Sequence, residues 1–312
     1  MRKPLLILLS LLLLVFLFGC SAGEAELEDS ESVIKVVTTI YPLADIIRQL
    51  GGNKVSVKYL LPAGASPHTY EPTVEQARQV SEAALFVHIG AGLDDWAVNL
   101  AETAEPGLHM LDLSKQVALL EMASEHRLED PNIADESRDQ GSADPHFWLD
   151  PLLVRDSICP AIYKQLVLLS PENEVYFLEK LENYGFELTL LHEEIEESIA
   201  AFSHDQFIAF HSAWQYFARR YQLKEVAVVA EFPGQEPSAG WVAELVRLIE
   251  KEKIGAIFAE SQFSSALAER IAEESKIEIM LLDPLGGEGL PNRETFIDLI
   301  RFNLAIFRQA LE

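Results

Sequence analysis

Strand-like apolar runs alternate with amphipathic helical segments along this chain, and the alternation occurs twice. The first series contains apolar runs at 33–40, 55–61 and 84–89. A helical segment follows the first run, and another follows the second, where Thr73 and Gln76 have the spacing of a capping box. Strands that alternate with helices in this way predict a parallel sheet with helices on both faces.

The second half of the chain repeats this plan. Its strand-like runs are 207–210, 226–232, 254–259 and 277–282. The loop after the second strand of each half also corresponds, because Glu-Pro-Thr at 71–73 matches Glu-Pro-Ser at 236–238. We therefore predict an α/β fold of two similar lobes, each a parallel sheet flanked by helices.

A long helical stretch separates the two halves. After Pro171 the chain has no proline as far as Phe202, and apolar residues recur there every three or four positions. About 30 helical residues would span about 45 Å at 1.5 Å per residue. We expect one stiff helix at 171–203 to join a lobe at 33–170 to a lobe at 204–312, and to allow less opening than flexible crossover strands would.

The first twenty residues have the features of an export signal. Two basic residues precede the apolar run 5–18, which leads into Gly19 and Cys20. The run has the length of a signal-peptide core and is shorter than the roughly 20 residues of a membrane span. A small residue followed by cysteine resembles a bacterial lipobox, so we predict a signal peptide at 1–20 and lipidation of Cys20. An uncleaved anchor helix is the alternative, because Phe18 is bulky for this position.

The acidic segment 21–32 lacks apolar periodicity and indicates a flexible tether. The whole chain has 24 Lys and Arg against 50 Asp and Glu, a formal net charge of −26. Such a charge argues against binding of nucleic acid through phosphate neutralisation and raises the local concentration of cations. Solubility accounts for most of this acidity, which by itself does not identify a metal protein. With Cys20 lipidated, Cys159 has no partner for a disulfide.

Four potential metal ligands lie far apart in the sequence but in similar positions. His68, His146, His211 and Asp283 each follow or end an apolar run, close to a proline or a predicted helix start. An α/β protein exposes side chains at such places, at the carboxyl ends of its strands. Three imidazoles and one carboxylate would suit a four-coordinate shell around a borderline ion such as zinc.

Two further residues are candidates for supporting roles. Glu260 follows a predicted strand and could orient a ligand imidazole through its second ring nitrogen. His126 could be an auxiliary zinc contact, since it lies in the polar and strongly acidic segment 121–144, which we interpret as an insertion loop.

These motifs in this order resemble the metal-binding subunits of bacterial zinc and manganese ABC transporters, the ZnuA/TroA-like solute-binding proteins. The resemblance spans nearly the whole mature chain. It is carried by VTTIYPLADI, LLPAGASPHTYEPT, GAGLDDWA, DPHFWLDP, FHSAWQYFARRY, EPSAGWV, FAESQFSS and LLDPLGG. It implies that His68, His146, His211 and Asp283 are the metal ligands.

The chain departs from the family pattern in two places. Zinc-uptake members often have a histidine-rich loop before the second ligand, where this chain is acidic, and Ser212 follows His211 where an acid is common. Manganese-specific relatives tend to carry glutamate at the position of His211. A third imidazole softens the shell and favours Zn²⁺, and Mn²⁺ is the alternative cargo.

The resemblance implies an exported receptor that captures Zn²⁺ between its lobes and delivers it to an ABC permease with its ATPase subunit. A lipid anchor would hold it at the outer face of the cytoplasmic membrane, or it would be periplasmic. We expect a monomer that is neither an enzyme nor a nucleic-acid binder. A zinc-dependent hydrolase is the alternative function, although the sequence has no HExxH motif. A role as an adhesin is neither supported nor excluded.

Overall fold

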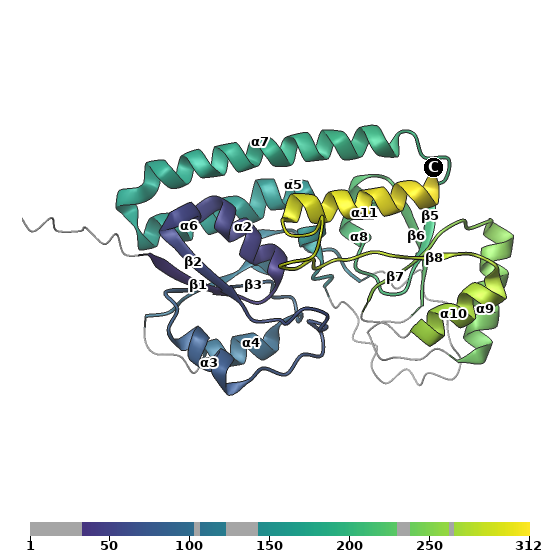
Figure 1. Ribbon diagram of the computed structural model, residues 1–312, viewed down its shortest axis with the longest axis horizontal. Coiled ribbons are helices and arrows are strands. Elements are labelled where there is room, and N and C mark those ends of the chain that lie inside the picture. Colours follow the sequence, from purple (N-terminus) through teal and green to yellow (C-terminus); the bar gives the residue numbers. More distant parts are fainter. Residues whose placement is uncertain (1–32, 103–106, 123–142, 230–237, 262–264) are drawn as a thin grey trace, which may run out of the picture. The chain divides into compact units, whose positions relative to one another are not determined.

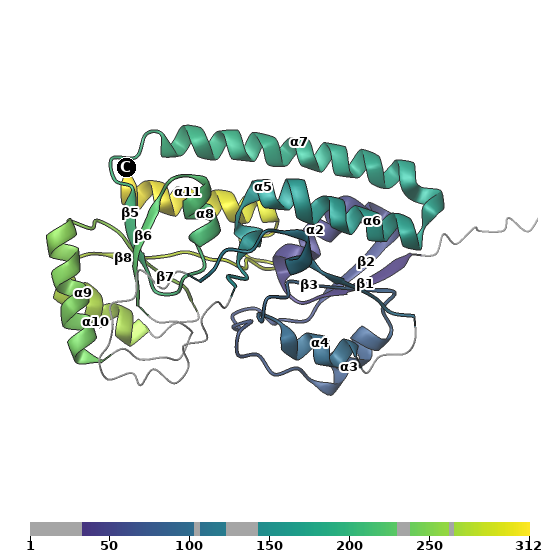
Figure 2. The same ribbon diagram turned by 180° about the vertical axis from the view of Figure 1, so that it is seen from behind.

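The structure is a computed structural model, shown from two sides in Figures 1 and 2. It describes residues 33–102, 107–122, 143–229, 238–261 and 265–312. The predicted signal peptide and tether at 1–32, including Cys20, lie outside these ranges, and so does His126. No helix in the described ranges is long and apolar enough to cross a membrane.

Two four-stranded parallel sheets form the framework. The first has the order β2-β1-β3-β4 and consists of β1 (Ile34–Thr38), β2 (Val55–Tyr59), β3 (Leu85–His88) and β4 (His109–Asp112). The second has the order β6-β5-β7-β8 and consists of β5 (Gln206–Ala209), β6 (Lys224–Val228), β7 (Ile257–Ala259) and β8 (Ile279–Leu281). The two sheets share one strand order, and the prediction of two similar α/β lobes is confirmed.

Helices cover both faces of each sheet (Figure 1). Those of the first lobe are α2 (Tyr41–Gly51), α3 (Val74–Ser81), α4 (Asp95–Ala101), α5 (Pro151–Leu153) and α6 (Cys159–Leu169). The long helix is α7 (Glu174–Ile199), and α8 (Gln215–Arg220), α9 (Ala239–Glu252), α10 (Ser265–Ser275) and α11 (Phe296–Leu311) follow it. Between α5 and α6 the chain forms a π-helical turn at Val154–Ile158.

The long helix is present but shorter than predicted. It has 26 residues, which corresponds to about 39 Å at 1.5 Å per residue. One side of α7 packs along α6 and α2 in the first lobe and along α11, the last helix of the chain (Figure 2). The helix is therefore held along its length by elements from both halves of the sequence.

One continuous apolar core extends through both lobes. Neighbouring strand residues point to opposite faces, so Val36 enters this shared core while Val37 packs toward α3 and α4. In the second lobe Phe207 belongs to the shared core, while Ile208 packs with α9 and α10. The described residues from 33 onward accordingly form one compact unit.

Buried hydrogen bonds also join the lobes. Trp148 Nε1 donates to the carbonyl oxygen of Pro284 at 2.9 Å, and the Phe296 amide donates to Asp45 Oδ2 at 2.7 Å. The Arg220 guanidinium forms an ion pair with Asp150, which is buried (2.8 Å). Separating the lobes would break these bonds and expose the shared core, so the structure favours a nearly fixed arrangement.

Candidate metal centre

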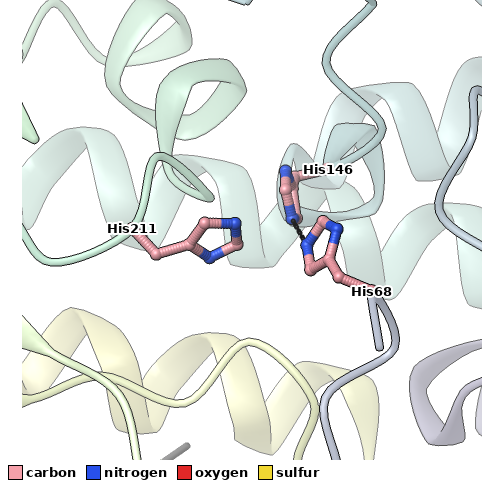
Figure 3. Close-up of side chains that lie close together, drawn as sticks. All are labelled: His68, His146 and His211. Carbon is pink, nitrogen blue, oxygen red and sulfur yellow. Dashed lines mark hydrogen bonds between the residues drawn. The ribbon is translucent and has the colours of Figure 1, made fainter. Parts of the chain in front are cut away.

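Three histidines from distant parts of the chain converge on one small cavity (Figure 3). One ring nitrogen from each of His68, His146 and His211 lies within 4.8 Å of the others. His68 Nε2 and His146 Nε2 are 3.3 Å apart and share a hydrogen bond in which one ring donates to the other. The ring of His211 stands nearly perpendicular to the other two, with centroid separations of 4.9 Å and 4.8 Å. A single small cation could contact all three rings.

Local sequence features explain where each imidazole lies. His68 lies in the loop between β2 and α3, and the predicted capping box of Thr73 and Gln76 is present at the start of α3. Trp96 supports this loop by donating from Nε1 to the Pro67 carbonyl oxygen at 2.9 Å.

His146 and His211 also lie in short connecting segments next to regular secondary structure. His146 immediately precedes a 3-10 turn at Phe147–Leu149. His211 lies two residues beyond the end of β5, and the next helix, α8, begins at Gln215. The residues between strand and helix thus present His211 at the carboxyl edge of the second sheet.

Burial keeps two of the imidazoles neutral. It lowers the pKa of His68 to about 2, and the neighbouring rings of His146 and His211 lower it further. Burial also lowers the pKa of His146 well below its ordinary value. A neutral imidazole can offer a lone pair to a metal, so these two side chains are ready to bind one near neutral pH.

Carboxylates contact the outer nitrogens of two rings. Asp144 Oδ1 lies 2.8 Å from His146 Nδ1 and accepts the His146 amide at 2.9 Å. Glu260 Oε1 lies 3.4 Å from His211 Nδ1. A carboxylate that binds Nδ1–H fixes the ring orientation and presents Nε2 to a metal. The predicted contact of Glu260 with an imidazole is present, whereas Asp144 was missed, although its place two residues before His146 could have suggested it.

The buried acids change the ionisation of the centre. Burial disfavours the charged form of His211, but the carboxylates of Glu260, Glu225 and Asp144 together outweigh this effect and raise its pKa. Burial raises the pKa of Asp144 to about 7, and it raises that of Glu225 to about 7 as well. Without a metal, negative charge in this region is therefore unfavourable.

The structure does not bring Asp283 into the cluster. Among the described residues, the group with ligand atoms close enough for one ion contains only the three histidines. Asp283 Oδ1 accepts the amides of Leu285 and Gly286, both at 2.9 Å, and Oδ2 pairs with Arg293 Nη1 at 3.0 Å. The carboxylate here stabilises the turn that follows it and neutralises an arginine.

The chain is similar to known proteins that are named for zinc uptake or zinc binding. Residues 36–310 match a family model described as "Zinc-uptake complex component A periplasmic". The chain is 28% identical to the zinc-binding lipoprotein AdcA of Streptococcus pneumoniae over 99% of its own length, and it spans 61% of that protein. It is 28% identical to the high-affinity zinc uptake system protein ZnuA of Bacillus subtilis, with 98% of this chain and 97% of that protein covered.

A manganese-binding protein and a crystal structure are also similar. The manganese-binding lipoprotein MntA of Halalkalibacterium halodurans is 25% identical, over 94% of this chain and 93% of that protein. A crystal structure of ZnuA superposes with a TM-score of 0.77 at 28% identity, covering 90% of this chain and all of that one. Relatives of the chain therefore include both zinc-binding and manganese-binding proteins.

Proposed function

The chain belongs to the zinc-uptake component A family of metal-binding solute-binding proteins, which are not enzymes, and from this premise we propose that it is the Zn²⁺ receptor of an ABC importer. One observation carries the proposal: ring nitrogens of His68, His146 and His211 converge within 4.8 Å. Three nitrogen ligands match the preference of zinc, while manganese prefers oxygen ligands. The relative named for manganese binding keeps Mn²⁺ as the alternative cargo.

The fourth ligand in this proposal is Asp283. Its carboxylate would have to leave Arg293, with which it pairs at 3.0 Å. The side chains of Arg293 and Asp283 are 27% and 15% exposed, so breaking this pair costs more than the about 0–1 kcal/mol of an exposed ion pair and less than the about 3–5 kcal/mol of a fully buried one. That cost is small beside about −12 kcal/mol for nanomolar binding, so release of Asp283 toward a bound cation is energetically accessible.

The partners follow from the proposed role. A permease with an ATPase subunit would accept the ion, and lipidated Cys20 would hold the receptor outside the cytoplasmic membrane through the tether 21–32. The shared core and the bonds from Trp148 and Asp45 across the lobes oppose spontaneous opening. We therefore expect delivery to require contact with the permease, which would displace His211 from the other two ligands.

Competitive metal titration tests the proposal. The chain without residues 1–20 is stripped of metal and offered Zn²⁺ or Mn²⁺ against a chelator of known affinity. We expect one Zn²⁺ per chain at nanomolar strength and Mn²⁺ at least a hundredfold weaker, and we expect His146→Ala to abolish tight binding.

Other results of this titration would change the assignment. Tighter Mn²⁺ binding would change the cargo, and the absence of tight binding for both ions would refute the receptor. Hydrolytic turnover that needs Zn²⁺ and is lost in His146→Ala would favour the hydrolase instead.

A further inference from the structure

Glu225 is a buried glutamate near His211, and it is not one of the residues whose atoms lie close enough together to bind one metal ion. Glu225 lies on β6, and only 6% of its surface is exposed. Its Oε1 accepts a hydrogen bond from Ser212 Oγ at 2.6 Å, and Ser212 is the residue that follows His211. Its Oε2 is buried and has no hydrogen-bond partner among the residues that the structure describes.

The local backbone places this side chain beside the centre. The register between β5 and β6 shifts after Phe207, which pairs with Glu225, so that Ile208 pairs with Ala227 and one residue of β6 is skipped. A bulge of this kind redirects neighbouring side chains and is frequent beside functional sites. The serine noted as a departure from the family pattern is thus hydrogen-bonded to a carboxylate from the adjacent strand.

Three acids lie around His211, and neither lysine nor arginine among the described residues offsets their charge. Asp144, Glu225 and Glu260 are all buried, and in the described part of the chain none of them pairs with a lysine or an arginine. Burying a carboxylate without a cation or a full set of hydrogen bonds is costly. A divalent cation held by three neutral imidazoles and the Asp283 carboxylate would have the opposite deficiency, since one net positive charge would be left without an anion in the ligand set.

We propose that Glu225 is a counter-charge for the bound divalent cation, and that it sets the affinity of the centre by its charge, without being a ligand. This inference rests on the proposed function, because it assumes that the three histidines bind the ion. Asp144 and Glu260 lie against ring nitrogens of the imidazoles and orient them, whereas the Glu225 carboxylate is hydrogen-bonded to the Ser212 hydroxyl. Its unpaired oxygen lowers the stability of the metal-free protein and favours the metal-bound form.

Glu225→Gln tests this proposal, because glutamine keeps the shape and can still accept the Ser212 hydrogen bond. Glu250→Gln, an exposed site on α9, makes the same change in net charge and serves as the control. At pH 8 we expect Glu225→Gln to weaken Zn²⁺ binding about tenfold. This is the lower end of the loss in affinity, about 10–100-fold, that follows when a residue supporting the metal ligands is replaced. We also expect its metal-free form to melt at a higher temperature than the parent protein, and the control to change neither quantity.

The two readouts separate charge from structural support. A residue that only supports the turn would lower the melting temperature of the metal-free protein and leave the affinity within twofold, and that result would overturn the proposal. If Glu225→Gln does not fold, Ser212→Ala decides, since it removes the hydroxyl and keeps the charge. Affinity within threefold then supports the proposal, and a tenfold loss overturns it. Failure of the parent protein to bind Zn²⁺ would refute the proposed function itself.

Discussion

The hydrogen bond between Asp144 and His146 provides the sharpest mutational test of the centre. Asp144 Oδ1 lies 2.8 Å from Nδ1 of the His146 ring and accepts a hydrogen bond from the His146 amide at 2.9 Å. Both residues are buried. Asp144→Asn keeps the shape but replaces a charge-assisted hydrogen bond of about 1.5–3 kcal/mol with a neutral one of about 0.5–1.5 kcal/mol. The difference is about 1–2 kcal/mol, and 1.4 kcal/mol is tenfold, so the Zn²⁺ dissociation constant should rise about 5–30-fold.

Competitive titration against a chelator at pH 8 measures this change. Asp95→Asn, an exposed site at the start of α4, is the control and should leave the affinity unchanged. The metal-free Asp144→Asn variant should be at least as stable as the parent at this pH, because burial raises the pKa of Asp144 to about 7 and its charged form is unfavourable there. An affinity within twofold of the parent would refute the role assigned to this carboxylate.

Four further outcomes are expected. Zn²⁺ affinity should fall as the pH drops through about 7, since burial raises the pKa values of Asp144 and Glu225 to about 7 and the protonated acids oppose the cation; equal affinities at pH 8 and pH 6 would contradict this. His211→Glu should lower the ratio of Zn²⁺ to Mn²⁺ affinity at least tenfold, because oxygen replaces nitrogen, and an unchanged ratio in the same titration would count against the argument from ligand softness. Asp283→Asn should weaken Zn²⁺ binding about tenfold in that assay, and a change below twofold would leave three imidazoles as the whole protein shell. Trp148→Phe should lower the free energy of unfolding by about 1–3 kcal/mol, because it leaves the Pro284 carbonyl oxygen in the other lobe without its hydrogen-bond donor. Denaturant unfolding measures this loss, and a value below about 0.5 kcal/mol would contradict the prediction.

The pH prediction differs from the one that the sequence alone supports. Free histidine has a pKa of about 6.5, so a three-histidine site would be expected to lose metal as its imidazoles become protonated. In the folded protein, burial holds the pKa of His68 near 2, and it holds that of His146 well below the ordinary value. The buried acids, together with His211, whose pKa these acids raise, therefore account for much of the pH dependence near neutrality.

Most of the fold was predictable because its sequence signals are local. Runs of apolar residues and the capping box before α3 predicted the positions of seven of the eight strands and the start of that helix. The missed strand is β4 (His109–Asp112), which has only four residues and is polar at both ends. Its strand conformation depends on pairing with β3, and no pattern within four residues reports such pairing.

Some residues of the site could also be predicted from local sequence signals, and others could not. The three histidines were identifiable, because each stands at the end of a strand or the start of a turn inside a motif. Asp144 was missed because its role depends on reaching Nδ1 of one particular ring. Glu225 was missed because it lies on β6, and only packing of strand against turn brings it to Ser212.

The sequence by itself determined the α/β class, the repeated plan and the three imidazoles, since strand alternation, helix caps and motif positions are encoded over short stretches. Tertiary structure alone decided that both lobes share one core and that Asp283 pairs with Arg293. It also decided that three buried carboxylates surround His211. These features arise from contacts between residues that are ten to more than two hundred positions apart. The strength of each charge there depends on how completely the folded protein removes it from water.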